Sequence, residues 1–201
     1  MKIAVDRNQV QAGSHYKSNF RNHRALAKMG HELVITVLPY GDYCEVTSRI
    51  EEMMGYCDGE PEKIDLAGCY EVAIDRKNSI DEVCGNVCSA TKEHNRFRKE
   101  CVRARNNGCR FIVLIEDDTV GSLDELEKWE NPRAKKYFIQ KARQAKGYKL
   151  KYPLAKQPPA SGKTLAKALR TMTEKYGVEF VFCKPEDAAQ RIVEILKGGN
   201  E

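Results

Sequence analysis

The pattern of apolar and polar positions divides the chain into short apolar runs and longer segments with helical spacing. Apolar runs predict strands at 2–6, 32–38, 41–47, 69–76, 110–116 and 178–183. Apolar residues with helical periodicity predict helices at 20–29, 80–106, 162–176 and from 185 to about 197, the second of them broken near 89–90. Since strands and helices alternate, the sequence predicts an α/β fold with a central, partly parallel sheet flanked by helices.

Two of the predicted helix starts carry a specific signal. Ser79 with Glu82, and Ser122 with Glu125, have capping-box spacing, in which two side chains satisfy backbone N–H groups that a helix start leaves free. These pairs predict one helix directly after the 69–76 strand and a second, short helix that ends near residue 129.

The polar stretch 48–66 shows neither pattern. A second metal cluster is one account of its acidic residues, and a solvated loop is the account that we favour. The acidic residues are Glu51, Glu52, Asp58, Glu60, Glu62 and Asp65.

The candidate chemistry begins where the strand 69–76 ends, at Asp75-Arg76-Lys77. Residues two apart on a strand point to the same face, so the side chains of Asp75 and Lys77 are expected together. A carboxylate and an ammonium beside a helix N-terminus suit a metal ion, a phosphate and an attacking water. The alternative is an ordinary surface salt bridge after a core strand, because an Asp-x-Lys sequence is common.

A second motif, Gly41-Asp42-Tyr43, follows the apolar run 33–38. The order strand, Gly-Asp, strand, Asp-x-Lys resembles the XPF-like nuclease family of the PD-(D/E)XK superfamily, whose pattern reads G-D-x and, after a variable gap, E-R-K-x-x-x-D. Asp75 replaces the Glu and shortens that ligand by one carbon, whereas Arg76, Lys77 and Asp81 match in type and spacing. The resemblance covers about residues 1–120, and the tail is similar to that of phage-borne members.

The resemblance implies a restriction-endonuclease-like central mixed sheet flanked by helices, in a single nuclease domain over 1–201. It implies a metal-dependent DNA endonuclease that hydrolyses phosphodiester bonds. The substrate is expected to be a flap, fork or junction, in DNA repair or recombination. No helix-hairpin-helix module follows the domain, which leaves the branched-DNA preference and a homodimer as open expectations.

The same resemblance implies roles for individual residues. Asp42 and Asp75 are expected to hold one or two Mg²⁺, for which Mn²⁺ is a possible substitute, together with a backbone carbonyl near Arg76. Lys77 orients or activates the attacking water, and Arg76 grips a phosphate or supports the carboxylates. Asp81 holds the Arg or Lys in place. Of the family's opening motif D-x-R-E, only the Asp is matched, by Asp6. Asp6 is expected to hold the metal ligands in position without binding the metal itself.

A change in charge marks residues 131–163, which hold ten basic residues and no acidic one. The whole chain has a net charge of +5, so the remainder has a net charge of −5 (5 − 10). Basic groups interleaved with aromatic residues are typical of a nucleic-acid groove, and a solvated loop without a partner is the alternative. We expect a basic, mobile insertion that contacts DNA, together with basic residues of the helix 80–106. The DNA-binding candidates are Arg96, Lys99, Lys135, Lys136, Lys141, Arg143, Lys146, Lys149 and Lys151.

The remaining patterns argue against other classes of function. Eight cysteines without a C-x-x-C pair are better read as small buried hydrophobes than as a zinc site. Ser161-Gly162-Lys163-Thr164 lacks the upstream glycine and strand of a P-loop, so no ATP is expected. No apolar run is long enough to span a membrane and no signal peptide is visible, so a cytoplasmic location is expected, in a phage, prophage or bacterial context.

Two other functions stay open at this point. One is a non-catalytic DNA-binding module of XPF-like type. The other is an interaction protein that zinc stabilises through the cysteines. Asp42, Asp75 and Lys77 argue against the first, because a module that only binds DNA does not need them. About one tightly held zinc per chain would favour the second.

Overall fold

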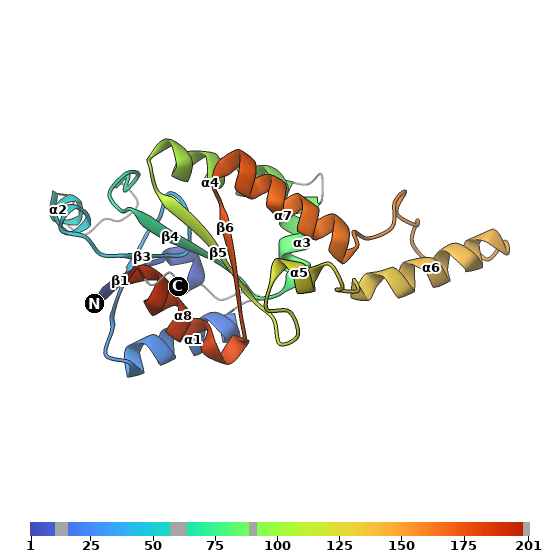
Figure 1. Ribbon diagram of the computed structural model, residues 1–201, viewed down its shortest axis with the longest axis horizontal. Coiled ribbons are helices and arrows are strands. Elements are labelled where there is room, and N and C mark those ends of the chain that lie inside the picture. The colour runs from blue at the N-terminus through green and yellow to red at the C-terminus, as the bar shows by residue number, and fades with distance from the viewer. Residues whose placement is uncertain (11–15, 57–63, 89–91, 199–201) are drawn as a thin grey trace.

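Residues 1–10, 16–56, 64–88 and 92–198 are described by a computed structural model, in which a six-stranded sheet lies between two layers of helices (Figure 1). The strands are β1 (Lys2–Asp6), β2 (Glu32–Thr36), β3 (Tyr43–Glu45), β4 (Val72–Lys77), β5 (Arg110–Glu116) and β6 (Glu179–Cys183). Their order is β2-β1-β3-β4-β5-β6. Strand β3 runs antiparallel to β1 and β4, and the other neighbours are parallel. The α/β class and the mixed central sheet are therefore confirmed.

Different helices cover the two faces of the sheet. Figure 1 shows α4 and α7 on one side of the sheet and α1 and α8 on the other. The helical elements are η1 (Arg7–Gln9), α1 (Tyr16–Lys28), α2 (Ser48–Tyr56), α3 (Ile80–Cys88), α4 (Lys92–Asn106), α5 (Leu123–Leu126), α6 (Pro132–Ala145), α7 (Gly162–Tyr176), η3 (Pro185–Asp187) and α8 (Ala188–Leu196). In β4, Ala73 packs in the core below α3, α4 and α7, whereas Ile74 packs in the core with α1 and α8. Side chains alternate along a strand, so Asp75 and Lys77 lie on the α3 side and Arg76 on the α1 side.

The predicted capping residues do cap their helices. Ser79 Oγ accepts the N–H of Glu82 at 3.3 Å, and the Glu82 carboxylate accepts the N–H of Asn78 at 3.0 Å. Ser122 Oγ accepts the N–H of Glu125 at 3.2 Å. The first of these boxes fixes the direction in which the chain leaves β4, next to Asp75-Arg76-Lys77.

Two helices lie where the sequence analysis predicted none: α2, within the stretch 48–66, and α6, within the basic insertion 131–163. The solvated loop favoured for 48–66 is therefore wrong for residues 48–56. Ile50 is the buried residue of α2 and Tyr137 that of α6, so neither helix has the wide apolar stripe that marks most helices in a sequence. The start of α6 is set by local chemistry instead. The Asn131 side chain accepts the N–H of Arg133, and Pro132 occupies the first turn.

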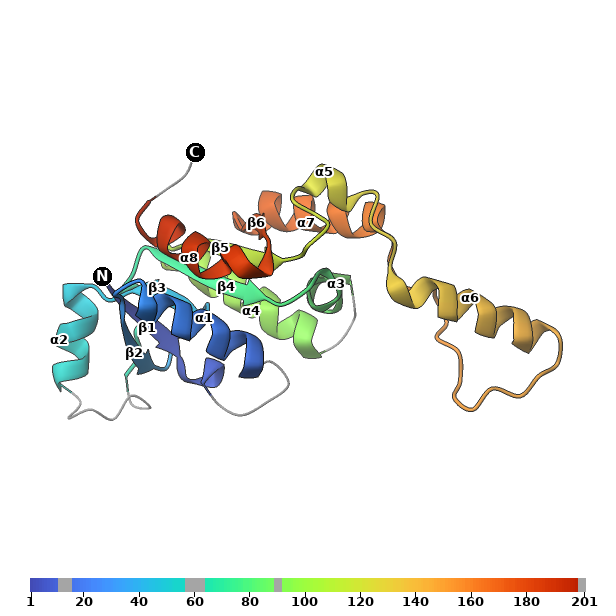
Figure 2. The same ribbon diagram turned by 90° about the horizontal axis from the view of Figure 1, so that it is seen from below.

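Helix α6 and the chain that returns from it reach away from the rest of the molecule (Figure 2). Most of the basic residues of 131–163 therefore lie on a projecting arm, which we call the α6 arm and define as residues 131–160. None of the helices in the described part of the chain is long and apolar enough to cross a membrane.

Gly162, the first residue of α7, lies against the backbone that follows α5. A Cβ there would lie 2.1 Å from the carbonyl oxygen of Leu126. We expect Gly162→Ala to lower the free energy of unfolding by about 1–3 kcal/mol or more, because a well-packed site must shift to accept the methyl group. Urea denaturation measures this change. Gly55→Ala in α2 is the matched control, since an added Cβ meets nothing within 4 Å; equal destabilisation of both variants would contradict the explanation.

Candidate active site

The Gly-Asp motif lies between the ends of β1 and β4. The N–H of Asp42 donates to the carbonyl of Ile74 at 2.7 Å, and its own carbonyl accepts the N–H of Asp6 at 2.9 Å. Gly41 has a φ of +75°, and a Cβ there would lie 3.1 Å from that of Ala73. Only glycine adopts this conformation easily at such close range, so the motif holds Asp42 directly beside the end of β4.

Both oxygens of the Asp42 carboxylate are held by protein donors. Oδ1 accepts from Gln9 Nε2 at 2.7 Å, and Oδ2 accepts from the backbone N–H of Arg76 at 2.8 Å. Burial raises the pKa of Asp42 well above its usual value, and the nearby Asp75 carboxylate raises it further. Two carboxylates that disfavour each other's charge form a place where a cation is stabilised.

Asp75 and Lys77 lie side by side on β4, and both are buried. Lys77 Nζ donates to Asp75 Oδ1 at 2.8 Å. Within the described part of the chain, Asp75 Oδ2 is buried and has no hydrogen-bond partner. Burial alone would lower the pKa of Lys77, but the Asp75 and Asp42 carboxylates outweigh it and raise that pKa, so Lys77 is an ammonium. Asp42, Asp75 and Lys77 line one cleft of about 850 Å³.

The guanidinium of Arg76 lies on the opposite face of the sheet from this carboxylate pair. Its Nε donates to Glu116 Oε1 at 2.6 Å, and it also donates to Asn19 and Asn78. Asn22 and Arg21 donate to the same Glu116 carboxylate. The expected phosphate contact of the Arg76 side chain does not fit this position, because the guanidinium is tied into a buried network. Arg76 supports the carboxylates through its backbone N–H instead.

The other two acidic candidates have partners of their own. Asp6 accepts the backbone N–H groups of Asn8 at 2.9 Å and Leu38 at 3.0 Å, so its carboxylate fixes the loops at the end of β1. Asp81 pairs with Arg133 of the α6 arm, rather than with the Arg or Lys of its own motif as expected. Both residues line the active-site cleft.

This geometry can now be compared with known proteins. The family model of the ERCC4 domain matches residues 5–196. The chain belongs to the ERCC4 domain family. The resemblance to XPF-like nucleases that the two motifs indicated is therefore confirmed.

A solved structure of an XPF protein has a similar fold. XPF from Aeropyrum pernix is similar to this ERCC4 domain with a TM-score of 0.50 at 13% sequence identity. The match covers 100% of this chain and 62% of that chain, so the chain spans less than two thirds of the archaeal protein. At this identity the likeness supports the XPF-like fold alone. No curated protein sequence matches the chain.

Gln9 and Glu100 are cleft residues of the ERCC4 domain that were missed in the sequence. Gln9 binds Asp42, and Glu100 of α4 lines the cleft close to Asp75. Burial, and next the Asp75 carboxylate, raise the pKa of Glu100 to about 7. Its position in the sequence could have revealed it. Glu100 lies next to Cys101 and one turn after Phe97, so an acidic residue stands at the edge of the apolar stripe of α4. Gln9 carried no signal, because its role depends on contact with a residue 33 positions away.

The basic candidates fall into two groups. Arg96 lines the cleft, whereas Lys99 is exposed one turn further along α4 and outside the cleft lining. The candidates of the α6 arm are all exposed: Lys135, Lys136, Lys141, Arg143, Lys146, Lys149 and Lys151. Arg133 was not a candidate, yet it is the arm residue that lines the cleft. Its ion pair with Asp81 ties the start of the arm to α3 at the edge of this cleft.

The residues of the cleft fit a magnesium ion. Asp75 Oδ2, which has no hydrogen-bond partner among the described residues, and the neighbouring Asp42 carboxylate would supply oxygen ligands, and Mg²⁺ commonly binds one or two carboxylates while it keeps several waters. No group of three or more His, Cys, Asp and Glu side chains that could hold a metal is found within the described residues. Two carboxylates with water ligands are thus the donor set that this ERCC4 domain offers there.

Neither the cysteines nor the acidic stretch forms a metal cluster within the residues that the structure describes. Cys44, Cys69, Cys84, Cys101 and Cys109 are buried, as expected for small hydrophobes. Some residues of these two sets lie outside the described ranges: Cys57, Asp58, Glu60 and Glu62.

Proposed function

We propose that this ERCC4 domain is a metal-dependent DNA endonuclease that hydrolyses phosphodiester bonds and prefers branched DNA such as flaps, forks or junctions. The observation that carries the proposal is the buried, unpartnered Asp75 Oδ2, in one cleft with Asp42 and Lys77. A buried carboxylate oxygen without a partner costs stability, which is expected where a ligand completes the site. Family membership supports the same class of reaction.

Asp42 and Asp75 would hold one or two Mg²⁺, with Mn²⁺ as a substitute. When bound, the ion stabilises negative charge on the phosphate and lowers the pKa of a bound water. An ammonium has three N–H donors, so Lys77 can hold Asp75 and at the same time orient an attacking water or a phosphate oxygen. Gln9 and the backbone N–H of Arg76 keep the Asp42 carboxylate in one orientation.

The first experiment is a cleavage assay on end-labelled plain duplex, 3′-flap, fork and four-way junction DNA of matched sequence. We expect cleavage with Mg²⁺ or Mn²⁺, faster cleavage of branched DNA than of duplex, and complete loss with a chelator. Restoring the metal should restore activity, which separates metal dependence from damage to the protein. Cleavage that persists in the chelator, or no cleavage of any substrate with either metal, would refute the proposal.

The α6 arm is proposed to bind the DNA backbone. Each phosphate contact that is lost should reduce the slope of log affinity against log salt by about 0.9. We therefore expect the double variant Lys141→Gln, Arg143→Gln to bind duplex DNA more weakly and with a smaller salt slope, as measured by fluorescence anisotropy. Lys28→Gln, an exposed change at the end of α1, is the control. An unchanged salt slope in the arm variant would contradict this role.

A further inference from the structure

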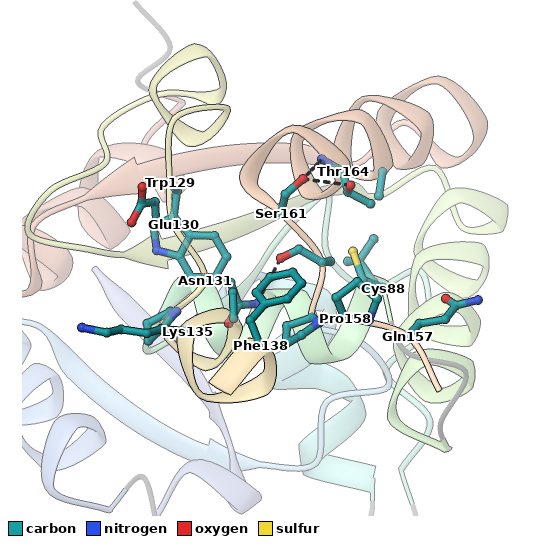
Figure 3. A pocket seen from close by; sticks show the side chains of 16 residues that line it. Cys88, Trp129, Glu130, Asn131, Lys135, Phe138, Gln157, Pro158, Ser161 and Thr164 are labelled. Atoms are coloured by element: carbon teal, nitrogen blue, oxygen red, sulfur yellow. Dashed lines mark hydrogen bonds between the residues drawn. The ribbon is translucent and has the colours of Figure 1, made fainter. Parts of the chain in front are cut away.

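A second cleft, of about 910 Å³, lies between α6, α7 and the end of α3. Figure 3 shows Trp129, Phe138 and Pro158 gathered around this cleft, with Cys88 of α3 on one side and Ser161, which caps α7, on another. Phe138 is 55% exposed, and Trp129 is half-buried and packs against the core. Exposed aromatic surface at a cleft is typical of a binding site.

The second cleft adjoins the active-site cleft. Gly85 and Asn86 of α3 line the active-site cleft, whereas Val87 and Cys88 line the second cleft. At the start of α6, Arg133 belongs to the first cleft and its two neighbours to the second. The two clefts therefore meet along the end of α3 and the start of α6.

The α6 arm, which supplies one wall of the second cleft, is positively charged, whereas the lining itself holds one basic and one acidic side chain. Residues 131–163, which form much of its wall, include ten basic residues and no acidic one. Lys135 lines the cleft, and the acidic residue in the lining is Glu130, which is exposed. Aromatic faces within a basic surface match a partner that carries both negative charge and flat apolar groups. A single nucleic-acid strand has this chemistry, because its bases stack on aromatic rings while its phosphates are neutralised.

We propose that the second cleft binds an unpaired nucleotide of the DNA strand that passes the active site, with the base stacked on Phe138 and Trp129. The proposal rests on the proposed nuclease function and names the part of a branched substrate that the domain recognises. Bases inside a duplex are already stacked and paired, so only an unpaired nucleotide can enter. An apolar peptide would gain nothing from the positive charge of the α6 arm, and a second copy of this chain is an outcome that the test below distinguishes.

Trp129 is the only tryptophan of the chain, so its fluorescence reports directly on the second cleft. The test titrates the full chain, without added metal, with short single-stranded oligo(dT) and with an abasic oligomer of equal length and charge. We expect oligo(dT) to quench Trp129 and the abasic oligomer to bind without quenching. Equal quenching by both oligomers, or oligo(dT) binding seen by anisotropy without quenching, would overturn the proposal.

Variants at Phe138 separate stacking from charge. Phe138→Ala should weaken oligo(dT) binding about tenfold, because the base loses an aromatic ring on which it stacks. It should leave the affinity for plain duplex DNA unchanged. Phe138→Tyr keeps the ring and should bind like the parent protein. Tyr56→Ala, which removes a ring that is 75% exposed on α2, is the control. If Phe138→Ala instead converts a dimer into a monomer in sedimentation, the second cleft is a protein interface and the proposal is wrong.

The same experiments distinguish this proposal from the nuclease proposal. Quenching by oligo(dT) without cleavage of any substrate would support the nucleotide site and refute the nuclease. Cleavage with no quenching would support the nuclease and refute the nucleotide site.

Discussion

Replacing Asp75 by asparagine should lower the rate of cleavage of a fork DNA by at least about a thousandfold, because a bound metal supplies several kcal/mol and each 1.36 kcal/mol is tenfold in rate. Asparagine keeps the shape of the side chain but removes the charge that would hold the ion. DNA affinity should be nearly unchanged, since the basic residues that we propose to contact phosphates lie on α4 and the α6 arm. The measurement is single-turnover cleavage beside a binding titration.

Two controls accompany the Asp75→Asn variant. Asp118→Asn removes an exposed carboxylate outside the cleft lining and should cleave like the parent protein. Thermal unfolding of Asp75→Asn checks that the protein is folded, because Lys77 loses the charge of its closest partner. Near-normal activity in a folded Asp75→Asn variant would show that the carboxylate pair is not needed for cleavage. Loss of both DNA binding and cleavage would mean that Asp75 positions the DNA rather than the ion.

The Arg76→Ala variant should lower the free energy of unfolding by about 3–5 kcal/mol, the usual cost of breaking one side of a buried ion pair. The side chains of Arg76 and Glu116 are 1% and 2% exposed. Removing the guanidinium leaves a buried carboxylate with only Arg21 and Asn22 as partners. Urea denaturation at neutral pH measures the loss.

The pH dependence of stability tests the same network. Burial would raise the pKa of Glu116, but the hydrogen bonds and charge of Arg76, followed by Asn22 and Arg21, outweigh burial and lower that pKa below 4.5. A carboxyl whose pKa is lower in the folded state contributes stability above its unfolded pKa, and this contribution is lost as the pH falls through the folded value. The difference between parent and Arg76→Ala should therefore shrink below pH 4.5.

Arg110→Ala is the matched control for Arg76→Ala. It breaks the ion pair with Glu179, whose two side chains are 25% and 40% exposed. An ion pair at the surface is worth about 1 kcal/mol or less, so this variant should be only slightly destabilised. Equal losses in the two variants would show that the Arg76 network is not a special source of stability.

The sequence was sufficient to predict that Asp75 and Lys77 lie together at the end of β4. Alternation along a strand brings Asp75 and Lys77 to one face, and the structure shows their ion pair at 2.8 Å. The same rule sends Arg76 to the other face, yet its partner Glu116 stands 40 residues later. That contact depends on the parallel register that sets Arg76 opposite Leu114, which a single sequence does not encode in any local pattern.

The helix α6 could not be predicted from hydrophobic periodicity. A helix that projects from the molecule buries little, and Tyr137 is its buried residue. Its local signals were the Asn131 cap and Pro132, which are weaker than an apolar stripe. The contact of Arg133 with Asp81, which brings this helix to the active-site cleft, joins positions 52 residues apart. Such a contact follows from the fold and not from the spacing of either residue.

The measurement that tests the central claim most directly is the binding of Mn²⁺ by the parent protein and by Asp75→Asn, followed by electron paramagnetic resonance. The signal of free Mn²⁺ falls when the ion binds. The account predicts that the parent protein takes up one or two Mn²⁺ ions, that Mg²⁺ competes for them, and that Asp75→Asn loses this uptake while the Asp118→Asn control keeps it. Equal Mn²⁺ uptake by parent and Asp75→Asn would contradict the account.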